Sequence, residues 1–287
     1  MQTPMLKTKV SRSIWTLCAL LAVPLLVGLG FLFTRLKPYW VAKYHGKGAD
    51  LHAAALPFAP LAGTNLDGAN LHGANLRGAN LARASLGVNM NATPLRMVGR
   101  YLYRLRPSAD LTGADLTGAD VTGAWMGDAR LTGAVLQGAN LQKADMVDGD
   151  LRGADLRSAD LRGAHFPGAN LNGASLIGAR LDAAYAGNIG LVGAKLARAS
   201  LRSAMLANAF LAGADLTGAD LTGADLRRAH LRRTSLRRAG LAGANLKHAD
   251  LSDADLQDAN LTGARYDRRT RWPPGFDPRR HGGVFVR

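Results

Sequence analysis

The sequence of 287 residues predicts an all-β solenoid that follows one N-terminal transmembrane α-helix. Two observations support this fold class. A leucine-sized residue recurs at every fifth position over most of the chain, with alanine two positions before it, and a segment of 22 residues near the N-terminus has no charged side chain. The first pattern requires a backbone that turns in every repeat, and the second is long enough to cross a lipid bilayer.

The predicted transmembrane helix covers residues 13–35, between a basic N-terminal tail (1–12) and a juxtamembrane linker (36–48). At about 1.5 Å per residue, its uncharged segment spans roughly 30 Å. A cleaved signal peptide is the alternative, but its apolar region is usually roughly 7 to 15 residues long and ends near a small-residue cleavage site, which is missing here. Basic residues flank both sides almost equally, so orientation is weakly encoded. The short basic leader favours a bacterial inner-membrane protein with its repeats in the periplasm.

The five-residue period excludes both a helix and a flat strand for the rest of the chain. From Leu111 to Tyr266, 26 of 32 central positions are leucine, and the residue two before is alanine in 29 of 32. A five-residue step rotates a helical side chain by about 140°, and in a strand it alternates between opposite faces. The chain must therefore turn in each pentad so that leucine and alanine point inward, with glycine suited to the corner.

The departures from leucine predict how many pentads form one coil. Five of the six departures are separated by multiples of twenty residues, at Met126, Met146, Phe166, Ala186 and Tyr266. One column of a twenty-residue coil would contain all five. Coils stacked at about 4.8 Å share hydrogen bonds and one continuous core, which an isolated pentad lacks.

The pentads "ADLTG", "ANLHG", "ANLRG" and "ADLRG" resemble the A-(D/N)-L-x-x unit of the pentapeptide repeat proteins. The resemblance implies a right-handed quadrilateral β-helix with four pentads per coil. It covers two arrays, residues 49–88 and 109–267. The ending "YDRRTRWPPGFDP" also resembles that of many bacterial members, which implies a C-terminal cap over residues 268–287. Some members are DNA mimics with acidic faces, but the formal net charge of +15 argues against that role here.

Residues 89–108 interrupt the period without changing its phase, which predicts an inserted loop or amphipathic helix. Leu95, Val98 and Leu102 follow a helical spacing, and basic residues such as Arg96 and Arg100 lie four apart on another stripe. The insertion could pack on the N-terminal coils or lie on an anionic membrane surface.

Nothing in the sequence points to catalysis, a metal or a cofactor. The aspartates recur directly before the central leucine, where a carboxylate binds nearby turn backbone. The seven histidines have no metal-ligand spacing, and no nucleophile with a base or phosphate-cradling loop is apparent. We therefore expect a protein that is not an enzyme.

The first function that the sequence favours is a membrane-tethered scaffold that binds a protein partner or another copy of itself. The column with the unusual centres also has large residues in its outward slot, and these form a candidate docking stripe: Trp125, His165, Tyr185 and Met205. Exposed aromatic and methionine side chains are typical of docking surfaces. The alternative is local repacking, with the Tyr185 ring turned toward the core beside the small Ala186.

The second function is anion binding. Three consecutive pentads present arginine pairs in outward slots, and these form a candidate girdle: Arg227, Arg228, Arg232, Arg233, Arg237 and Arg238. Arginine suits phosphate, so anionic lipid is a possible ligand. Nucleic acid is less favoured because no aromatic residues lie nearby for base stacking. A simple solvated basic surface is the remaining interpretation.

Overall fold

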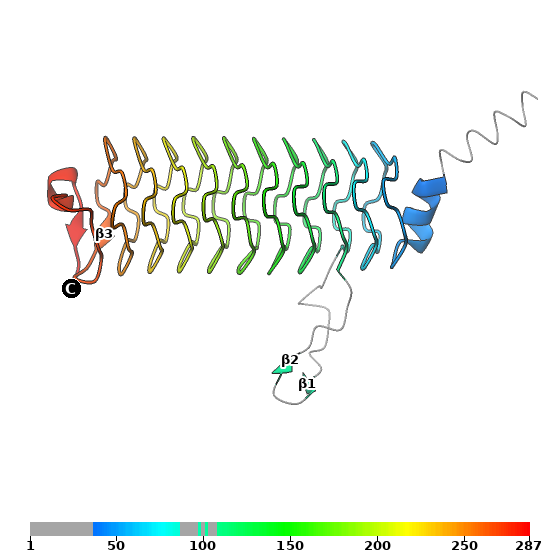
Figure 1. Ribbon diagram of the computed structural model, residues 1–287, viewed down its shortest axis with the longest axis horizontal. Coiled ribbons are helices and arrows are strands. Elements are labelled where there is room, and N and C mark those ends of the chain that lie inside the picture. Colours follow the sequence, from blue (N-terminus) through cyan, green and yellow to red (C-terminus); the bar gives the residue numbers. More distant parts are fainter. Residues whose placement is uncertain (1–36, 87–96, 99–100, 103–107) are drawn as a thin grey trace, which may run out of the picture.

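The computed structural model describes residues 37–86, 97–98, 101–102 and 108–287, and it contains a β-helix whose coils stack along one axis (Figure 1). Single parallel bridges join residues twenty apart, as from Asp110 to Arg130 and from Arg130 to Asp150. The prediction of four pentads per coil is therefore confirmed. Each outward slot before a central residue forms part of one of four columns that run along the helix.

Most pentads turn through a bend that is closed by a backbone hydrogen bond. The Ala114 N–H donates to the Leu111 carbonyl at 2.9 Å, and Gly113 within this bend has φ of 65°. Such a positive φ favours glycine, as expected from the sequence. The described residues include non-glycine residues in the same slot, however, among them Arg228 with φ of 59°.

Adjacent coils satisfy each other's backbone groups. The Leu111 N–H donates to the Arg130 carbonyl at 2.7 Å, and the Asp110 N–H donates to the Ala69 carbonyl at 2.9 Å. This pattern repeats along the array, so the backbone N–H and carbonyl groups of one coil are hydrogen-bonded to those of the next. The stability of any coil therefore depends on its neighbours.

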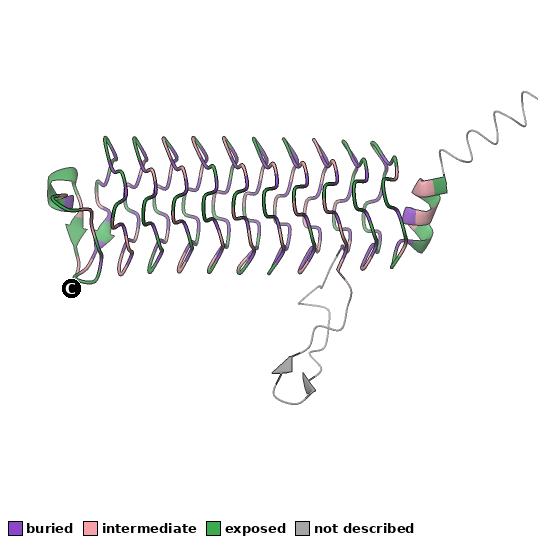
Figure 2. Cartoon of the chain, in the orientation of Figure 1, coloured by how far each residue is buried: buried purple, intermediate pink, exposed green. Residues whose placement is uncertain are grey.

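Leucine and alanine fill the interior, and the buried positions recur along every coil (Figure 2). Leu161 and Leu201 have no exposed surface. Thr234 occupies an alanine slot, and its hydroxyl donates to the Leu211 carbonyl at 2.8 Å. The inward slot thus tolerates a hydroxyl when a carbonyl is within reach.

A helix over residues 37–45 lies at the N-terminal end of the array (Figure 1). Ala42 is completely buried, and Tyr39 and Val41 pack against the core. These contacts cover the apolar end of the first coil, and within the expected juxtamembrane linker (36–48) residues 37–45 form this helix. No helix within the described residues is long and apolar enough to cross a membrane. The predicted span, residues 13–35, lies outside the described residues.

The C-terminal residues form a small folded unit beside the last coil. Strand β3 (Arg265–Tyr266) pairs in parallel with β4 (Val284–Phe285), and the 3-10 helix η1 (Pro278–His281) lies between them in sequence. The ring of Tyr266 meets that of Trp272 edge-on, with centroids 5.5 Å apart, and Trp272 stacks on Phe276. Trp272 and Phe276 are partly buried against the core.

The insertion contains strands β1 (Met97–Val98) and β2 (Tyr101–Leu102), which pair antiparallel. The amphipathic helix is therefore wrong for these four residues. Gly99 and Arg100 separate the strands in sequence, and a two-residue connection that begins with glycine favours a hairpin over a helix. Other residues of the predicted segment lie outside the described part of the chain. On either side, Ser85 pairs with Trp125, so the column continues across the insertion.

Candidate functional site

One of the four outward columns carries large side chains in place of turn-forming ones. Successive parallel bridges connect its members, which we call the aromatic column: Trp125, Asp145, His165, Tyr185 and Met205. The structure therefore brings the four predicted stripe residues onto one face, together with one aspartate.

Side-chain contacts join three members of the aromatic column, Asp145, His165 and Tyr185. The rings of His165 and Tyr185 stack with centroids 4.9 Å apart, and His165 Nδ1 lies 3.7 Å from Asp145 Oδ1. Tyr185 and Met205 are 45% and 46% exposed, whereas Trp125 is half-buried. Tyr185 and Met205 thus present more free surface than Trp125, which the sequence alone does not reveal.

The Tyr185 ring lies outside the core. Ala186, the small central residue that follows it, is buried, and the next inward alanine slot contains the buried Ile189. Ile189 is larger than the alanine usual in this slot, and we expect it to occupy volume that a leucine at position 186 would fill. This arrangement differs from the repacking alternative, in which the ring fills the core.

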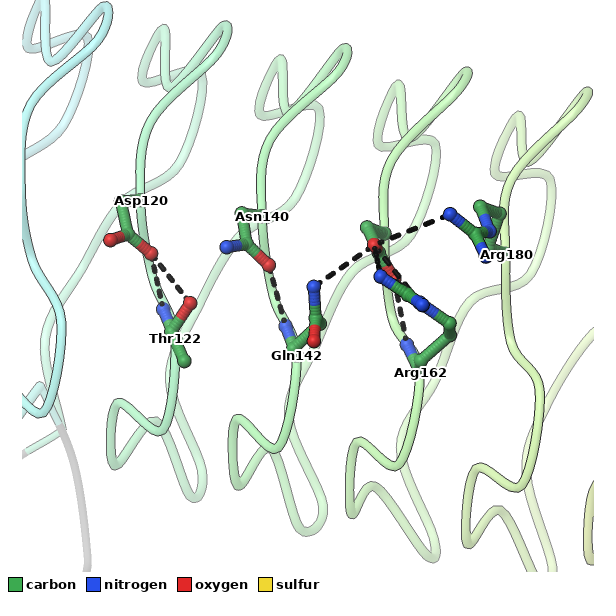
Figure 3. A network of polar contacts seen from close by, with 7 residues as sticks. Asp120, Thr122, Asn140, Gln142, Arg162 and Arg180 are labelled. Carbon is green, nitrogen blue, oxygen red and sulfur yellow. Dashed lines mark hydrogen bonds and ion pairs between the residues drawn. The ribbon is translucent and has the colours of Figure 1, made fainter.

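Aspartates and asparagines in the other columns organise turns. Asp120 Oδ1 accepts the backbone N–H of Thr122 at 3.1 Å and its hydroxyl at 2.6 Å, and Asn140 Oδ1 accepts the N–H of Gln142 (Figure 3). Arg162 binds its own pentad's Asp160 in the same way and adds two side-chain contacts. These carboxylates are bound to the scaffold itself. No group of three or more potential metal ligands occurs among the described residues.

Most of the predicted arginine girdle is engaged in ion pairs. Arg227 Nε donates to Asp225 Oδ1 at 2.8 Å, and Nη2 donates to Oδ2 at 2.6 Å. Burial raises the pKa of Asp225, but hydrogen bonds from Arg227 outweigh it and hold this pKa below its usual value. Three further pairs reach the next coil: Arg232 with Asp253, Arg237 with Asp255 and Arg238 with Asp258.

Two girdle residues, Arg228 and Arg233, have no carboxylate partner within the described part of the chain. Arg228 borders a shallow depression of about 410 Å³ together with Arg269 and Arg271. Arg271 lies 3.5 Å from Asp250, which also lines this depression. Arg228 thus adds positive charge to a basic corner near the C-terminal end, whereas Arg233 lies on the next corner of the coil.

Sequence reasoning missed a second stack, on the column next to the aromatic column. The rings of Phe210 and His230 are nearly parallel, with centroids 5.1 Å apart, and Phe210 is 45% exposed. Their separation of twenty residues is the signal that could have revealed it.

The repeat pattern and the coil geometry agree with a known family. The family model described as pentapeptide repeats matches in eight copies, over residues 47–86, 114–153, 150–185, 194–233 and 229–265. The chain belongs to the pentapeptide repeat family. Its pentapeptide repeats accordingly form a right-handed β-helix.

Several solved structures are similar to this pentapeptide repeat protein. HetL from the cyanobacterium Nostoc sp. strain PCC 7120, involved in heterocyst differentiation regulation, is 30% identical; the match covers 80% of this chain and 92% of HetL, with a TM-score of 0.39. Rfr23 from the cyanobacterium Cyanothece 51142 is 34% identical over 34% of this chain and 63% of Rfr23, with a TM-score of 0.30. QnrB1, a plasmid-mediated fluoroquinolone resistance protein, is 19% identical over 78% of this chain and 92% of QnrB1, with a TM-score of 0.31. No curated protein matches the chain.

Proposed function

We propose that this pentapeptide repeat protein is a non-enzymatic, membrane-anchored scaffold for protein–protein interaction, and that its docking surface is the aromatic column. One observation carries the proposal: Tyr185 and Met205 expose nearly half their surface on a column where neighbouring coils are rigidly stacked. Aromatic and methionine side chains are enriched in the cores of protein interfaces.

The scaffold presents this surface in a fixed geometry. Each column residue is held by two backbone hydrogen bonds to the preceding coil, as at Tyr185, whose N–H donates to the Ala164 carbonyl and whose carbonyl accepts from the Phe166 N–H. A partner therefore binds without ordering the backbone, which reduces the entropic cost of association.

The anchor in the proposal rests on the uncharged residues 13–34, and the periplasmic side rests on the basic leader before them. A topology reporter fused after Arg287 tests this part. Periplasmic activity would support the bacterial inner-membrane arrangement with external repeats. Cytoplasmic activity would reverse the side and would make cytoplasmic proteins the candidate partners.

Photo-crosslinking from the column tests the docking surface. A photoreactive phenylalanine analogue in place of Tyr185 should give a discrete protein adduct in cells, and Met205→Ser should weaken it. The analogue at Lys195, an exposed outward slot on another column, is the control. The absence of an adduct at 185, or the same adducts from both positions, would contradict the docking surface.

Anion binding through the girdle is the second candidate, because residues 226–287 contain fourteen Lys and Arg against six Asp. Phosphate-bearing surfaces bind such regions with a strong dependence on salt. Arg228→Gly with Arg233→Gly should weaken the binding of residues 37–287 to anionic vesicles. Both positions have positive φ, so glycine introduces no backbone strain.

The matched control is Arg83→Gly with Arg198→Gly, which removes the same charge from the same turn slot on other pentads. Equal losses in the two double variants would indicate a general effect of net charge. Duplex DNA at the same ionic strengths distinguishes a lipid ligand from nucleic acid. Binding to neither, or binding insensitive to salt, would exclude this function.

A further inference from the structure

The corner next to the aromatic column changes charge along the helix. Its positive-φ slot, which we call the corner row, contains in successive coils Asp128, Asp148, Gly168, Asn188, Asn208, Arg228 and His248. The acidic end and the basic end are thus arranged almost symmetrically about Asn188. The charge pattern of this row is therefore complementary to that of a second copy aligned antiparallel to it.

The middle of this corner is low and flanked by exposed apolar groups. The slot before the corner row contains Pro167, Gly187 and Ala207 at the three central coils, so no long side chain stands on the ridge. Tyr185 and Met205 lie on one side of the ridge, and Phe210 lies on the other, each with 45% to 46% exposure. Two such ridges can approach closely while their aromatic flanks make contact.

We propose that the partner of the aromatic column is a second copy of this chain, bound antiparallel about a two-fold axis near Asn188. This inference rests on the proposed docking function and specifies its partner. In a two-fold interface the same patch serves both copies, so each contact occurs twice. Asp148 of one copy then faces Arg228 of the other at both ends of the contact.

The spacing of the coils makes this register consistent. Asp148 lies two coils before Asn188, and Arg228 lies two coils after it, about 10 Å in each direction at 4.8 Å per coil. Both side chains are exposed. Arg228 has no carboxylate partner within the described residues, and Asp148 also has a contact within its own chain, to which the new pair would be added.

A parallel pairing would place like charges together. In that arrangement Asp148 faces Asp148 and Arg228 faces Arg228, and opposed like charges across an interface are strongly unfavourable. The antiparallel arrangement also fixes the geometry at a membrane. The two N-terminal ends lie at opposite ends of the pair, so two copies anchored in one bilayer would have their helix axes parallel to its surface.

Charge reversal in the full chain tests the orientation. By light scattering after gel filtration in detergent, the wild-type chain should form a dimer. Asp148→Arg and Arg228→Asp should each raise the dimer dissociation constant by more than about tenfold, because each places like charges opposite one another. An equimolar mixture of the two variants should restore the dimer, since both charge pairs across the interface would then again join an arginine to an aspartate.

A cysteine at the axis gives an independent readout. In a Cys18→Ser background, Asn188→Cys should form a disulfide-linked dimer on mild oxidation, whereas Arg228→Cys should not, because its counterpart would lie about 20 Å away. Asp148→Cys combined with Arg228→Cys should link again. Thermal melting of every variant confirms that its fold is retained.

A monomeric wild-type chain would overturn the self-association. A dimer that the mixture fails to restore would overturn the antiparallel register. In either case the docking function is tested separately, by whether a photoreactive residue at position 185 forms an adduct with any protein. An adduct with a different protein would support docking and refute the second copy.

Discussion

The ring of Tyr185 stacks on that of His165 in the preceding coil, with the ring planes 21° apart. The stack lies outside a core position that contains the smallest of the unusual central residues, Ala186. The exposed ring and the reduced centre are thus separate features of one pentad. Ile189, three residues later, is buried and larger than the alanine usual in its slot, so we expect it to fill the core space that Ala186 leaves.

This relationship predicts that Ile189 and Ala186 are energetically coupled. Ile189→Ala should lower the free energy of unfolding by about 2 to 5 kcal/mol, because it leaves a cavity in a closely packed core. Ala186→Leu alone should also destabilise by about 1 to 3 kcal/mol through overpacking. The double variant restores the usual leucine and alanine pattern and should regain most of the loss. Thermal melting measures the three variants, and additive losses would show that the two sites do not share space.

The repeat, the inward residues and the twenty-residue coil could be predicted because each depends on local volume and periodicity. The combination of a small residue at Ala186 with a large one at Ile189 could not be predicted, because it depends on how two pentads pack across a corner. The same limit applies to the girdle. From the sequence, the arginines at 232, 237 and 238 have no acidic partner within their own pentads. Their aspartate partners are in the next coil, some twenty residues later. The helix over 37–45 was not predicted because its apolar side chains are buried only by packing against the end of the array, a contact that the local sequence does not show.

The assignment of inward and outward faces predicts unequal costs of substitution. Leu161 has no exposed surface, so Leu161→Ala should cost about 2 to 5 kcal/mol. Thr217 lies outward, and its hydroxyl contacts Ser235 Oγ at 2.9 Å. Thr217→Ala should therefore cost about 1 kcal/mol. Equal melting losses for the two variants would contradict the faces as assigned.

Acid should weaken the array through a row of arginine–aspartate pairs. Arg157 Nε donates to Asp155 Oδ1 at 2.8 Å, and the hydrogen bond from this side chain, partly opposed by burial, lowers the pKa of Asp155 below its usual 3.8. Arg152 lowers the pKa of Asp150 in the same way. A group whose pKa is lower in the folded state stabilises that state above its unfolded pKa, and the contribution is lost as pH falls through the folded pKa.

The melting temperature should therefore decrease as pH falls below about 4. Asp150→Asn with Asp155→Asn retains an oxygen that can accept the turn N–H but removes both charges. This double variant should melt lower at pH 7 and show a shallower dependence on pH. A dependence as steep as that of the wild type would show that other groups are responsible.

At the positive-φ slot of the pentad, replacing glycine by alanine should lower the free energy of unfolding, and replacing alanine by glycine should raise it. Gly113 has φ of 65°, and a Cβ there would meet nothing within 4 Å, so Gly113→Ala costs conformational energy alone, about 1 kcal/mol. Ala183 adopts φ of 54° in the same slot, so Ala183→Gly should stabilise. Chemical denaturation can measure both. Changes of the same sign would indicate that side-chain contacts dominate at this slot.

The N-terminal helix should be sensitive to a single methyl group at Gly46. A Cβ there would lie 2.5 Å from the Ala42 carbonyl oxygen and 2.6 Å from Leu66 Cδ2, so Gly46→Ala must displace the helix from the first coil. Overpacking of this kind costs about 1 to 3 kcal/mol. Because each coil is stabilised by its neighbours, hydrogen exchange should accelerate in residues 49–66 and remain slow beyond residue 109. Gly48→Ala is the matched control, since a Cβ there meets nothing within 4 Å although φ is 66°. If both variants accelerate exchange equally, backbone strain rather than the helix contact protects the first coil.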